Sequence, residues 1–582
     1  GVAGQPIRIT AAPGLNAQQV HVYGVGVSSS NALRRTVPVQ LSKDYLAVDG
    51  FTVSFQNGLQ VGQRGANIQV FGKNVTVRNM RVIHDATQAE GPLAPGQLGE
   101  HVRQARLNAG TKEVGISAVG SFGLYENNLV QDMWQGIGLD AKIGRTNNVV
   151  RGNTVADAVY DGIHIGGGDN TPLSHIIENN VIYGAMVSDG ITMDSGVASE
   201  NHGINQVVIR NNAIFNIGEN AIDLKGTRNI LIEGNYLWGI LGDNDGSGVI
   251  DRSVSINDHI HDEQAGEAIG RGAHSTSEDV IIRNNVVIDS NGATFAPKNG
   301  KIYNNTFLNN RRNAADGANQ PTNETDARKP RDAAITERVG TLNVTILNNI
   351  IGDHGYEVVT FDSAGNGGVL DGNTYYNTFQ SPRFSAFADN HDWTAVEFEA
   401  WQAWLASQEN YEGEVHSQVV AGGPGSLFVN VPDQVTGDPA QYDFGLSNHS
   451  EAIDAGVFLT HTVGDGSGIV LTVADGDLFF DGYGMTLGDL IQLENQSQTA
   501  RIVGILGDVL TLDQSLTWSD GVGVSLAYHG LRPDAGAIES SVPTPSSLAV
   551  LGLGSALWVG SRPKKKKTHG VGLRETRWLE VD

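Results

Sequence analysis

Polar side chains of the kinds that transfer protons or bind cations recur along this chain beside Gly-Ile pairs. The repeated segment reads Gly-Ile-x-apolar-x and starts at Gly115, Gly136, Gly162 and Gly190, with a variant at Ala221. Because side chains alternate across a strand, the isoleucine and the next apolar residue are expected to fill a core, while the residues between them point outward. One outward column then contains Ser117, Gly138, His164, Thr192 and Asp223, and its neighbour contains Val119, Asp140, Gly166, Asp194 and Lys225.

The two columns predict a single surface patch, since paired strands lie about 4.8 Å apart. His164, Asp194, Asp223 and Lys225 should share this patch, with Asp140 at its margin. Glycines at 138 and 166–168 leave the floor beside the patch open, as a sugar-binding groove requires. Two simpler interpretations stay open. Outward charges often only solvate such a face, and a lysine between two aspartates is stable as an ion pair.

One chemistry that fits the patch is β-elimination on a uronate polymer. A cation neutralises the uronate carboxylate and acidifies the C5 proton, which a neutral base then removes. Lys225 is the predicted base, and His164 would support or replace it. Asp194, Asp223 and Glu219 are the predicted cation ligands, because hard cations such as calcium take oxygen ligands.

An inverting glycoside hydrolase is the second chemistry that fits the patch. Such enzymes place two carboxylates about 6.5–9.5 Å apart around a water molecule. Asp140 and Asp194, two coils apart, are expected near the upper limit of that separation. Asp140 and Thr192 are also predicted to contact the saccharide.

A second repeat indicates the elements that position the patch. Two aliphatic residues, a polar residue and Asn-Asn or Gly-Asn precede an apolar pair, and the closing residues of the first copies are Asn128, Asn153, Asn180, Asn212 and Asn235. Their spacings of 25, 27, 32 and 23 residues are typical of one coil of a parallel β-helix. Stacked asparagines can pair amide to amide, and asparagine tolerates a left-handed turn. The predicted fold is therefore an all-β, right-handed parallel β-helix, which is a solenoid.

The repeats predict three parts of the chain. Residues 1–390 are expected to form the β-helix, residues 391–540 a C-terminal cap region, and residues 541–582 a tail. Phe398, Trp401 and Trp404 have helical spacing and predict a helix against the end of the coils. Residues 463–530 alternate apolar and polar side chains between Gly/Asp turns, which predicts a small inserted β module.

Two resemblances concern the cap region and the tail. The segments SEAIDAG at 450–456 and RPDAGAIE at 532–539 resemble the closing segments of bacterial secreted β-helix proteins. The tail combines a Pro/Ser turn, an apolar run at 548–560 and a basic cluster at 562–567, and it resembles the PEP-CTERM sorting signal. Its apolar run is shorter than the about 20 residues of an ordinary spanning helix. These resemblances imply a bacterial protein that is secreted or held in the cell envelope, with the tail as its anchor.

Residues 219–226 and 229–235 resemble the catalytic coil of the chondroitinase B and alginate lyase family. In that family, acidic calcium ligands precede an Ile-rich strand that ends in the base lysine, so the resemblance implies these roles for Glu219 and Lys225. The next coil of the family carries a catalytic arginine, whose counterpart here is Arg271, with His274 just beyond it as a predicted substrate contact. The chain departs from the family at Asn220, where a second acidic ligand is expected. The patch is also similar to that of calcium-dependent pectate lyases.

Composition limits the partners. The net charge of −26 argues against nucleic acid, whose phosphates need a Lys/Arg surface. The same carboxylates suit calcium, and they also simply keep a secreted protein soluble. With no cysteines, the chain can hold neither a disulfide scaffold nor a Cys-ligated zinc site. The predicted partner is an acidic polysaccharide, and the protein is predicted to be a monomer.

These observations favour a secreted polysaccharide lyase that cleaves a uronate polymer with the help of calcium. A β-helical glycoside hydrolase or epimerase is one alternative, and a non-catalytic glycan-binding surface protein is another. The fold does not decide among them, because function lies in the site.

Overall fold

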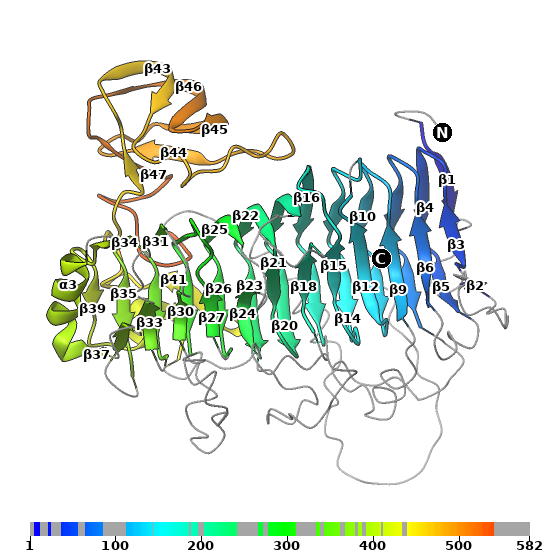
Figure 1. The fold of residues 1–582 in the computed structure, drawn as a ribbon, viewed down its shortest axis with the longest axis horizontal. Helices are drawn as coiled ribbons and strands as arrows, with labels where there is room; N and C mark the ends of the chain where they lie inside the picture. The colour runs from blue at the N-terminus through cyan, green and yellow to red at the C-terminus, as the bar shows by residue number, and fades with distance from the viewer. Residues whose placement is uncertain are drawn as a thin grey trace, which may run out of the picture.

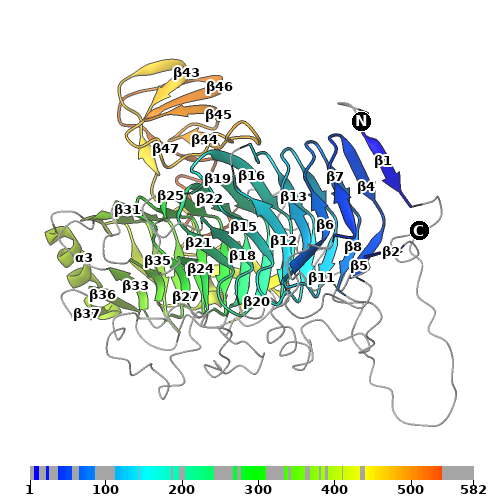
Figure 2. The same ribbon diagram turned by 45° about the vertical axis from the view of Figure 1, so that its right-hand side comes forward.

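Three long sheets run along the molecule, and each coil of the chain adds one strand to each sheet (Figure 1). In the computed structural model, the described residues are 5–540, except for 12–20, 25–36, 56–63, 85–111, 143, 185–187, 196–202, 241–265, 272–276, 291, 310–332, 338–342, 355, 361–366, 379–381, 387–390, 409–410 and 433–438. All strand pairs within the three sheets are parallel except the last pair of the third sheet. The described chain is a right-handed parallel β-helix, as predicted, and its elongated shape is clear in Figure 2.

The strands of each sheet follow in order along the axis. Sheet one contains β1 (Ile7–Thr10), β4 (Leu46–Asp49), β7 (Thr76–Arg78), β10 (Leu124–Glu126), β13 (Val149–Arg151), β16 (Pro172–Glu178), β19 (Ile204–Arg210), β22 (Thr227–Glu233), β25 (Glu278–Arg283), β28 (Lys301–Tyr303), β31 (Val344–Leu347), β34 (Gly368–Asp371) and β38 (Tyr411–Gly413). Sheet two contains β2 (His21–Gly24), β5 (Thr52–Phe55), β8 (Arg81–Ile83), β11 (Leu129–Gln131), β14 (Thr154–Ala156), β17 (Val181–Tyr183), β20 (Ala213–Ile217), β23 (Tyr236–Ile240), β26 (Val286–Ile288), β29 (Thr306–Leu308), β32 (Ile350–Gly352), β35 (Thr374–Tyr376) and β39 (Gln418–Val419). Sheet three contains β3 (Val39–Leu41), β6 (Arg64–Val70), β9 (Lys112–Ala118), β12 (Gln135–Asp140), β15 (Ile163–Gly166), β18 (Ile191–Asp194), β21 (Ile222–Lys225), β24 (Glu267–Arg271), β27 (Gly292–Phe295), β30 (Ala333–Thr336), β33 (Tyr356–Thr360), β36 (Arg383–Ala386) and β37 (His391–Thr394).

A ladder of buried asparagines joins the turns between sheets one and two. In each step, the side-chain amide of one asparagine donates to the side-chain carbonyl of the next, over 2.9–3.0 Å. The asparagine ladder consists of Asn128, Asn153, Asn180, Asn212, Asn235, Asn285, Asn305, Asn349 and Asn373. The same carbonyls accept backbone N–H groups, for example that of Asn153 on Asn180 at 2.9 Å. Since buried amides must be satisfied, each turn can accept only one register against its neighbours.

The residue before each ladder asparagine has a different task. It adopts the left-handed conformation that turns the chain, as at Asn284, Asn304 and Asn348 with φ of 53°, 52° and 56°. In Asn284, Asn304 and Asn348 the side chain also binds the C-terminal segments. Asn284 donates to the carbonyl of Ala537 at 3.1 Å, and Asn348 donates to that of Val457 at 2.8 Å. The Asn-Asn repeat thus supplies one residue to the ladder and one to the turn surface.

The apolar core fills the inside of the coils. The isoleucines of the Gly-Ile repeat have 0% exposure and pair with one another in consecutive coils, and they are Ile116, Ile137, Ile163, Ile191, Ile222 and Ile269. Full burial of such a side chain contributes about 1.5–3 kcal/mol. A slip of one residue would turn this column to the outside, so burial reinforces the register that the asparagine ladder sets.

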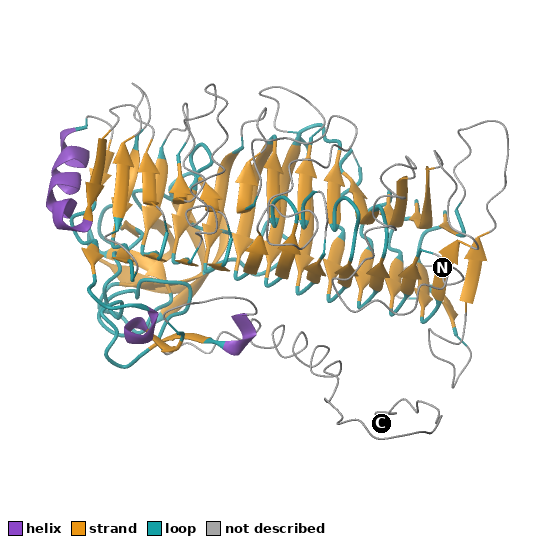
Figure 3. Ribbon diagram, turned by 90° about the horizontal axis from the view of Figure 1, so that it is seen from below, coloured by secondary structure: helices purple, strands orange, loops and turns teal. Residues whose placement is uncertain are grey.

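A helix closes the C-terminal end of the coils (Figure 3). The short 3-10 helix η1 (Ala395–Glu397) leads into α3 (Phe398–Ser407), and Phe398, Trp401 and Leu405 are buried on one face. Trp401 packs on Phe384 of the last parallel strand of sheet three, with ring centroids 5.4 Å apart. This confirms the predicted capping helix, which covers the apolar end that a solenoid otherwise exposes. The parallel stacking continues past the predicted boundary at residue 390, because β38 and β39 follow α3.

The remaining C-terminal elements form an inserted module and the segments that carry it. Strands β42 (Thr460–His461), β43 (Gly466–Thr472), β44 (Leu490–Leu493), β45 (Thr499–Leu506), β46 (Val509–Trp518) and β47 (Gly523–Leu526) form one antiparallel sheet. The chain enters and leaves this module side by side, since Ala535 N–H donates to the carbonyl of Ala452 at 3.0 Å. Before it come α4 (Pro424–Leu427), β40 (Phe428–Asn430), the 3-10 helix η2 (Pro439–Gln441) and β41 (Asp443–Leu446).

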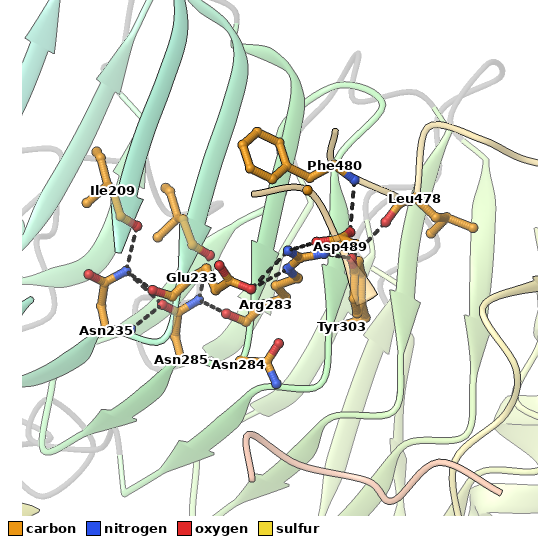
Figure 4. A network of polar contacts seen from close by, with 12 residues as sticks. Ile209, Glu233, Asn235, Arg283, Asn284, Asn285, Tyr303, Leu478, Phe480 and Asp489 are labelled. Carbon is orange, nitrogen blue, oxygen red and sulfur yellow. Dashed lines mark hydrogen bonds and ion pairs between the residues drawn. The ribbon is translucent and has the colours of Figure 1, made fainter. Parts of the chain in front are cut away.

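A ladder of alternating charges on sheet one ends where the module docks. Its members lie opposite one another in consecutive coils, and they are Asp49, Arg78, Glu126, Arg151, Glu178, Arg210, Glu233 and Arg283. Arg283 is buried, and it pairs with Glu233 at 2.9 Å and with both oxygens of Asp489 from the module at 2.6 and 2.5 Å (Figure 4). The hydroxyl of Tyr303 donates to the carbonyl of Leu478 beside them at 2.7 Å. The module thus supplies the acid that completes the ladder.

Parts of the sequence predictions fall on residues that the structure leaves undescribed. The tail at 541–582 and the side chain of Arg271 are among them, as is His274. Within the described residues, no helix combines the length and the apolar character needed to cross a membrane.

Removing one member of the asparagine ladder should destabilise the whole helix. In an Asn180→Ala variant, the backbone N–H and side-chain amide of Asn153 lose their acceptor, and the side-chain carbonyl of Asn212 loses a donor. Unsatisfied buried groups cost about 1–3 kcal/mol each, so we expect a loss of about 3 kcal/mol or more in the free energy of unfolding. Chemical denaturation measures this loss, with exposed Asn430→Ala as the control. Equal stability of the two variants would contradict the role of the ladder.

Breaking the buried ion pair between Arg283 and Asp489 should destabilise the fold, and a second substitution should restore most of the stability. Arg283→Met leaves Asp489 buried without its partner, and we expect a loss of about 3–5 kcal/mol. Adding Asp489→Asn removes the stranded charge and keeps an acceptor for the backbone N–H of Phe480, so most of the loss should be recovered. Denaturation of the single and double variants tests this, with Lys298→Met as the control, because Lys298 is exposed and its partner Glu278 keeps a second pair with Arg228. If the double variant is less stable than the single one, the buried charge is not the cause.

Candidate functional site

The outward columns of sheet three meet as the sequence predicts. The strand register places Gly138, His164, Thr192 and Asp223 in one row, each pairing with the next. The adjacent row contains Asp140, Gly166, Asp194 and Lys225 in the same way. The predicted residues from β12, β15, β18 and β21 thus lie together on sheet three near the middle of the helix (Figure 1), but Thr192 and Asp223 are buried there and do not reach the surface. This face belongs to sheet three and lies close to the turns that join it to sheet two.

Under this face lies a set of buried polar residues that the sequence analysis missed. They precede the glycine or alanine of the Gly-Ile repeat, and Asp161, Asp189 and Asn220 among them have 0% exposure. The backbone and side-chain amides of Asn220 both donate to Asp189 at 3.0 Å. The signal was present in the sequence, because Asp-Gly-Ile occurs at both 161–163 and 189–191. A buried carboxylate is costly unless hydrogen bonds or cations compensate it, so these residues need partners.

His164 is one of those partners. Its Nδ1 lies 2.8 Å from Asp161, and its side chain is 23% exposed while that of Asp161 is fully buried. Burial alone would lower the pKa of His164, but the hydrogen bond and charge of Asp161 outweigh it and raise that pKa above its usual value. The same contact outweighs the effect of burial on Asp161, whose pKa is lowered. His164 therefore carries a stabilised proton on Nδ1.

The second ring nitrogen of His164 lies over a glycine. A methyl group built on Gly166 would collide with His164 Nε2, so only glycine at 166 leaves room for the ring in this position. Asp194, the partner of Gly166 in the next coil, adds to the electrostatic stabilisation of the protonated ring. Gly166 thus has a clear role, which is to seat the imidazole above the floor of the face.

Lys225 is held as a cation. Its Nζ lies 2.5 Å from Asp223 and 3.7 Å from Asp189, and both of these carboxylates are fully buried. Burial opposes the ammonium, but Asp223, Asp189 and Glu219 outweigh it and raise the pKa of Lys225 above its usual value. A lysine acts as a base only when neutral. The surroundings therefore favour a charge-neutralising role for Lys225 over the base role that the sequence suggests.

Thr192 links the two halves of the cluster and does not face the solvent. Its hydroxyl is 2.8 Å from Asp161 and 2.9 Å from Asp189, and the residue is 3% exposed. A hydroxyl carries one proton, so it can donate to one carboxylate only and must accept from the other. Burial and the neighbouring Asp223 raise the pKa of Asp189 to about 7, whereas the pKa of Asp161 is lowered, so Asp189 takes up a proton more readily than Asp161 does. The predicted substrate contact thus lies beneath the face as a hydrogen-bond bridge.

The predicted cation ligands take part in this same cluster. Lys225 pairs with Asp223, and burial and Asp189 raise the pKa of Glu219 well above its usual value. In the described part of the chain, no three His, Asp or Glu side chains are arranged to hold a metal ion. The residues present here are thus compensated by an internal ammonium group, and their arrangement does not fit a calcium site. Calcium binding stays a prediction, and no chemical step is assigned to it below.

Three further predicted residues lie at the edges of the cluster. Asp140 forms an ion pair with Arg145, so its charge is already compensated at the margin of the face. Arg271 pairs through its backbone with Leu224, and it therefore shares the row of Leu224 and not that of Lys225. His274 lies outside the described residues.

Two aromatic side chains flank the cluster on its N-terminal side. Trp134 and Tyr160 stack with ring centroids 5.4 Å apart, and both are partly exposed. Tyr160 is adjacent to Asp161, and its pKa is raised to about 12 by burial and by that carboxylate. Binding sites for small molecules are commonly lined by aromatic side chains with a few placed polar groups. The site thus combines an aromatic wall, a histidine that can exchange a proton, and a fixed ammonium group.

Comparisons with known proteins return similar structures only. No protein-family model and no curated protein matches the chain. The pectate lyase Pel9A matches at 12% identity and a TM-score of 0.37, over 90% of this chain and 89% of that one. A PL6 family polysaccharide lyase from Pseudopedobacter saltans matches at 13% identity and a TM-score of 0.37, over 77% and 87%. The A-module of mannuronan C-5 epimerase AlgE6 from Azotobacter vinelandii matches at 14% identity and a TM-score of 0.38, over 72% and 92%.

The histidine–aspartate pair predicts a measurable titration. Because Asp161 raises the folded-state pKa of His164 above its unfolded value near 6.5, the pair stabilises the fold below about pH 6.5 and loses this contribution as pH rises through the folded pKa. NMR titration of the His164 ring should give a pKa above 6.5, and Asp161→Asn should lower it. Exposed His461 serves as the internal control. A His164 pKa that does not fall in Asp161→Asn would show that this carboxylate is not its stabilising partner.

Proposed function

We propose that this chain cleaves a uronate-containing acidic polysaccharide by β-elimination at the His164–Lys225 cluster. One observation carries the proposal. A partly exposed histidine and a partly exposed lysine stand on adjacent rows of one face, two coils and thus about 10 Å apart along the axis, and each is fixed by a fully buried aspartate. Such an arrangement offers a proton-exchanging group and a positive charge to a saccharide that lies along the axis, which are the two requirements of this reaction.

Lys225 supplies the positive charge. A uronate carboxylate that binds its ammonium group loses much of its negative charge, so the carbanion that forms at C5 is stabilised. Asp223 and Asp189 keep the ammonium protonated and hold it in place before substrate arrives. Groups that are oriented in advance stabilise developing charge without reorganisation, which makes them effective in catalysis.

His164 supplies the base. With its Nδ1–H directed at Asp161, the neutral ring presents Nε2 to the substrate. Nε2 takes the C5 proton, the C4–O4 bond breaks, and a C4–C5 double bond forms in the new terminal uronate. The departing O4 takes up one proton, which the imidazolium is placed to return. The raised pKa of His164 implies that this step becomes faster as pH rises through that value, because the ring must first be neutral.

The cellular setting is proposed on the resemblances of the sequence alone. We infer a bacterial protein that is secreted or kept in the envelope, since its tail resembles a PEP-CTERM sorting signal and its closing segments resemble those of secreted β-helix proteins. Because this protein is strongly acidic, an acidic polysaccharide would bind it only at a locally positive group. Lys225 is such a group on this face.

Incubation with a panel of alginate, pectate and glycosaminoglycans tests the proposal. We expect an ultraviolet absorbance from unsaturated uronates, and a rate reduced by at least about 10²-fold in His164→Gln and in Lys225→Ala. Lys73→Ala, an exposed lysine away from the face, should keep the full rate. EDTA should leave the rate unchanged if Lys225 neutralises the uronate.

Other products would assign another reaction. New reducing ends without the absorbance would contradict the lyase and indicate a hydrolase. Inversion at C5 without cleavage would indicate an epimerase, which shares the first proton transfer. Binding of the polymer without any product would indicate an adhesive protein.

A further inference from the structure

A second histidine–carboxylate pair lies on the same edge, two coils toward the N-terminus. His84 follows β8, and its Nδ1 lies 2.5 Å from Glu113 in β9. The side chain of His84 is 23% exposed, whereas that of Glu113 is 2% exposed. His84 thus repeats the arrangement of His164, with a partly exposed ring whose Nδ1 is held by a buried carboxylate.

The carboxylate of this pair is anchored by the core. Asn67 has 0% exposure, and its side-chain amide donates to Glu113 Oε1 at 2.6 Å. The same amide lies 3.4 Å from the sulfur of Met133, the residue before Trp134. Among the described residues, the carbonyl oxygen of Asn67 has no hydrogen-bond partner. A buried carboxylate with an anchored partner fixes the ring of His84 more firmly than a surface ion pair would.

The stacked aromatic pair joins the two histidines. Glu113 lies in β9, Trp134 precedes β12, and Tyr160 and Asp161 precede β15. These strands belong to three consecutive coils, so the residues follow one another along the axis. Paired strands are about 4.8 Å apart, so about 10 Å separates the first coil from the third. A row of histidine, aromatic wall and histidine therefore runs parallel to the axis of the helix.

We propose that His84 and Trp134 form a remote subsite that binds the carboxylate and ring of a uronate residue in the same polysaccharide chain. The inference rests on the proposed function, because it requires a polymer that lies along the row with one residue at the His164–Lys225 cluster. As an imidazolium, with Nδ1–H on Glu113, His84 would donate from Nε2–H to a sugar carboxylate, and the partly exposed Trp134 would contact the apolar side of a ring. His84 takes no part in bond cleavage and increases the affinity for long polysaccharide chains.

Calorimetric titration of the full chain tests the subsite apart from catalysis. We use the His164→Gln variant, which prevents turnover, and saturated uronate oligomers from two to eight residues. Adding His84→Gln should raise the dissociation constant of the longest oligomers about tenfold, since a hydrogen bond to a charged group is lost, and should leave the shortest unchanged. Trp134→Ala should act in the same direction, and His461→Gln, on the exposed surface of the module, should have no effect.

The outcomes separate this inference from the proposed function. If His84→Gln changes no dissociation constant, or changes all of them equally, there is no remote subsite. If oligomers bind with the expected dependence on length but the wild-type chain cleaves none of them, the subsite stands and the lyase reaction fails. If no oligomer binds at any length, both fail.

Discussion

Hydrogen bonds between stacked asparagines set the geometry on which the rest of the molecule depends. From Asn153 to Asn349, each ladder amide pairs with an asparagine one coil above and one coil below, at 2.9–3.0 Å. Burial alone would tolerate a slip of two residues, because alternate positions along a strand face the same side. The ladder removes this freedom, since a shift would strand buried amides. Burial of the isoleucine columns then adds stability to a register that is already defined.

A fixed register makes a site possible on a regular scaffold. Residues 31 positions apart, such as Thr192 and Asp161, are held within hydrogen-bond distance because consecutive coils cannot slide. The site places four acidic side chains beneath His164 and Lys225, and these acids differ in how readily they ionise. Asp161 and Asp223 face His164 and Lys225, while Asp189 and Glu219 have raised pKa values. The cluster thus contains an exchangeable proton on His164 and a positive charge on Lys225 that stays in place.

The sequence was sufficient for the fold, the turns and the outward columns, because each follows from a short repeat and the alternation of strands. It was not sufficient for the residues that give the columns their chemistry. Asp161 and Asp189 were missed because the alternation of inward and outward side chains was taken to start at the glycine of each repeat. The chain instead bends at this glycine. The carboxyl group before it therefore lies on the outer side of the coil, beneath His164 and Thr192. The charge of Lys225 depends on Asp189, which comes from the preceding coil, and the docking of the module depends on Arg283 and Asp489, 206 residues apart. Contacts of this kind have no local signature.

In the proposed reaction, His164 and Lys225 act together on one uronate residue. A crystal structure of the His164→Gln variant with a saturated uronate tetramer would show whether they do. We expect a saccharide that lies along sheet three, with one carboxylate on the Lys225 ammonium group and the C5 hydrogen of that residue directed at position 164. A tetramer bound on another face, or one whose carboxylates all point away from Lys225, would contradict it.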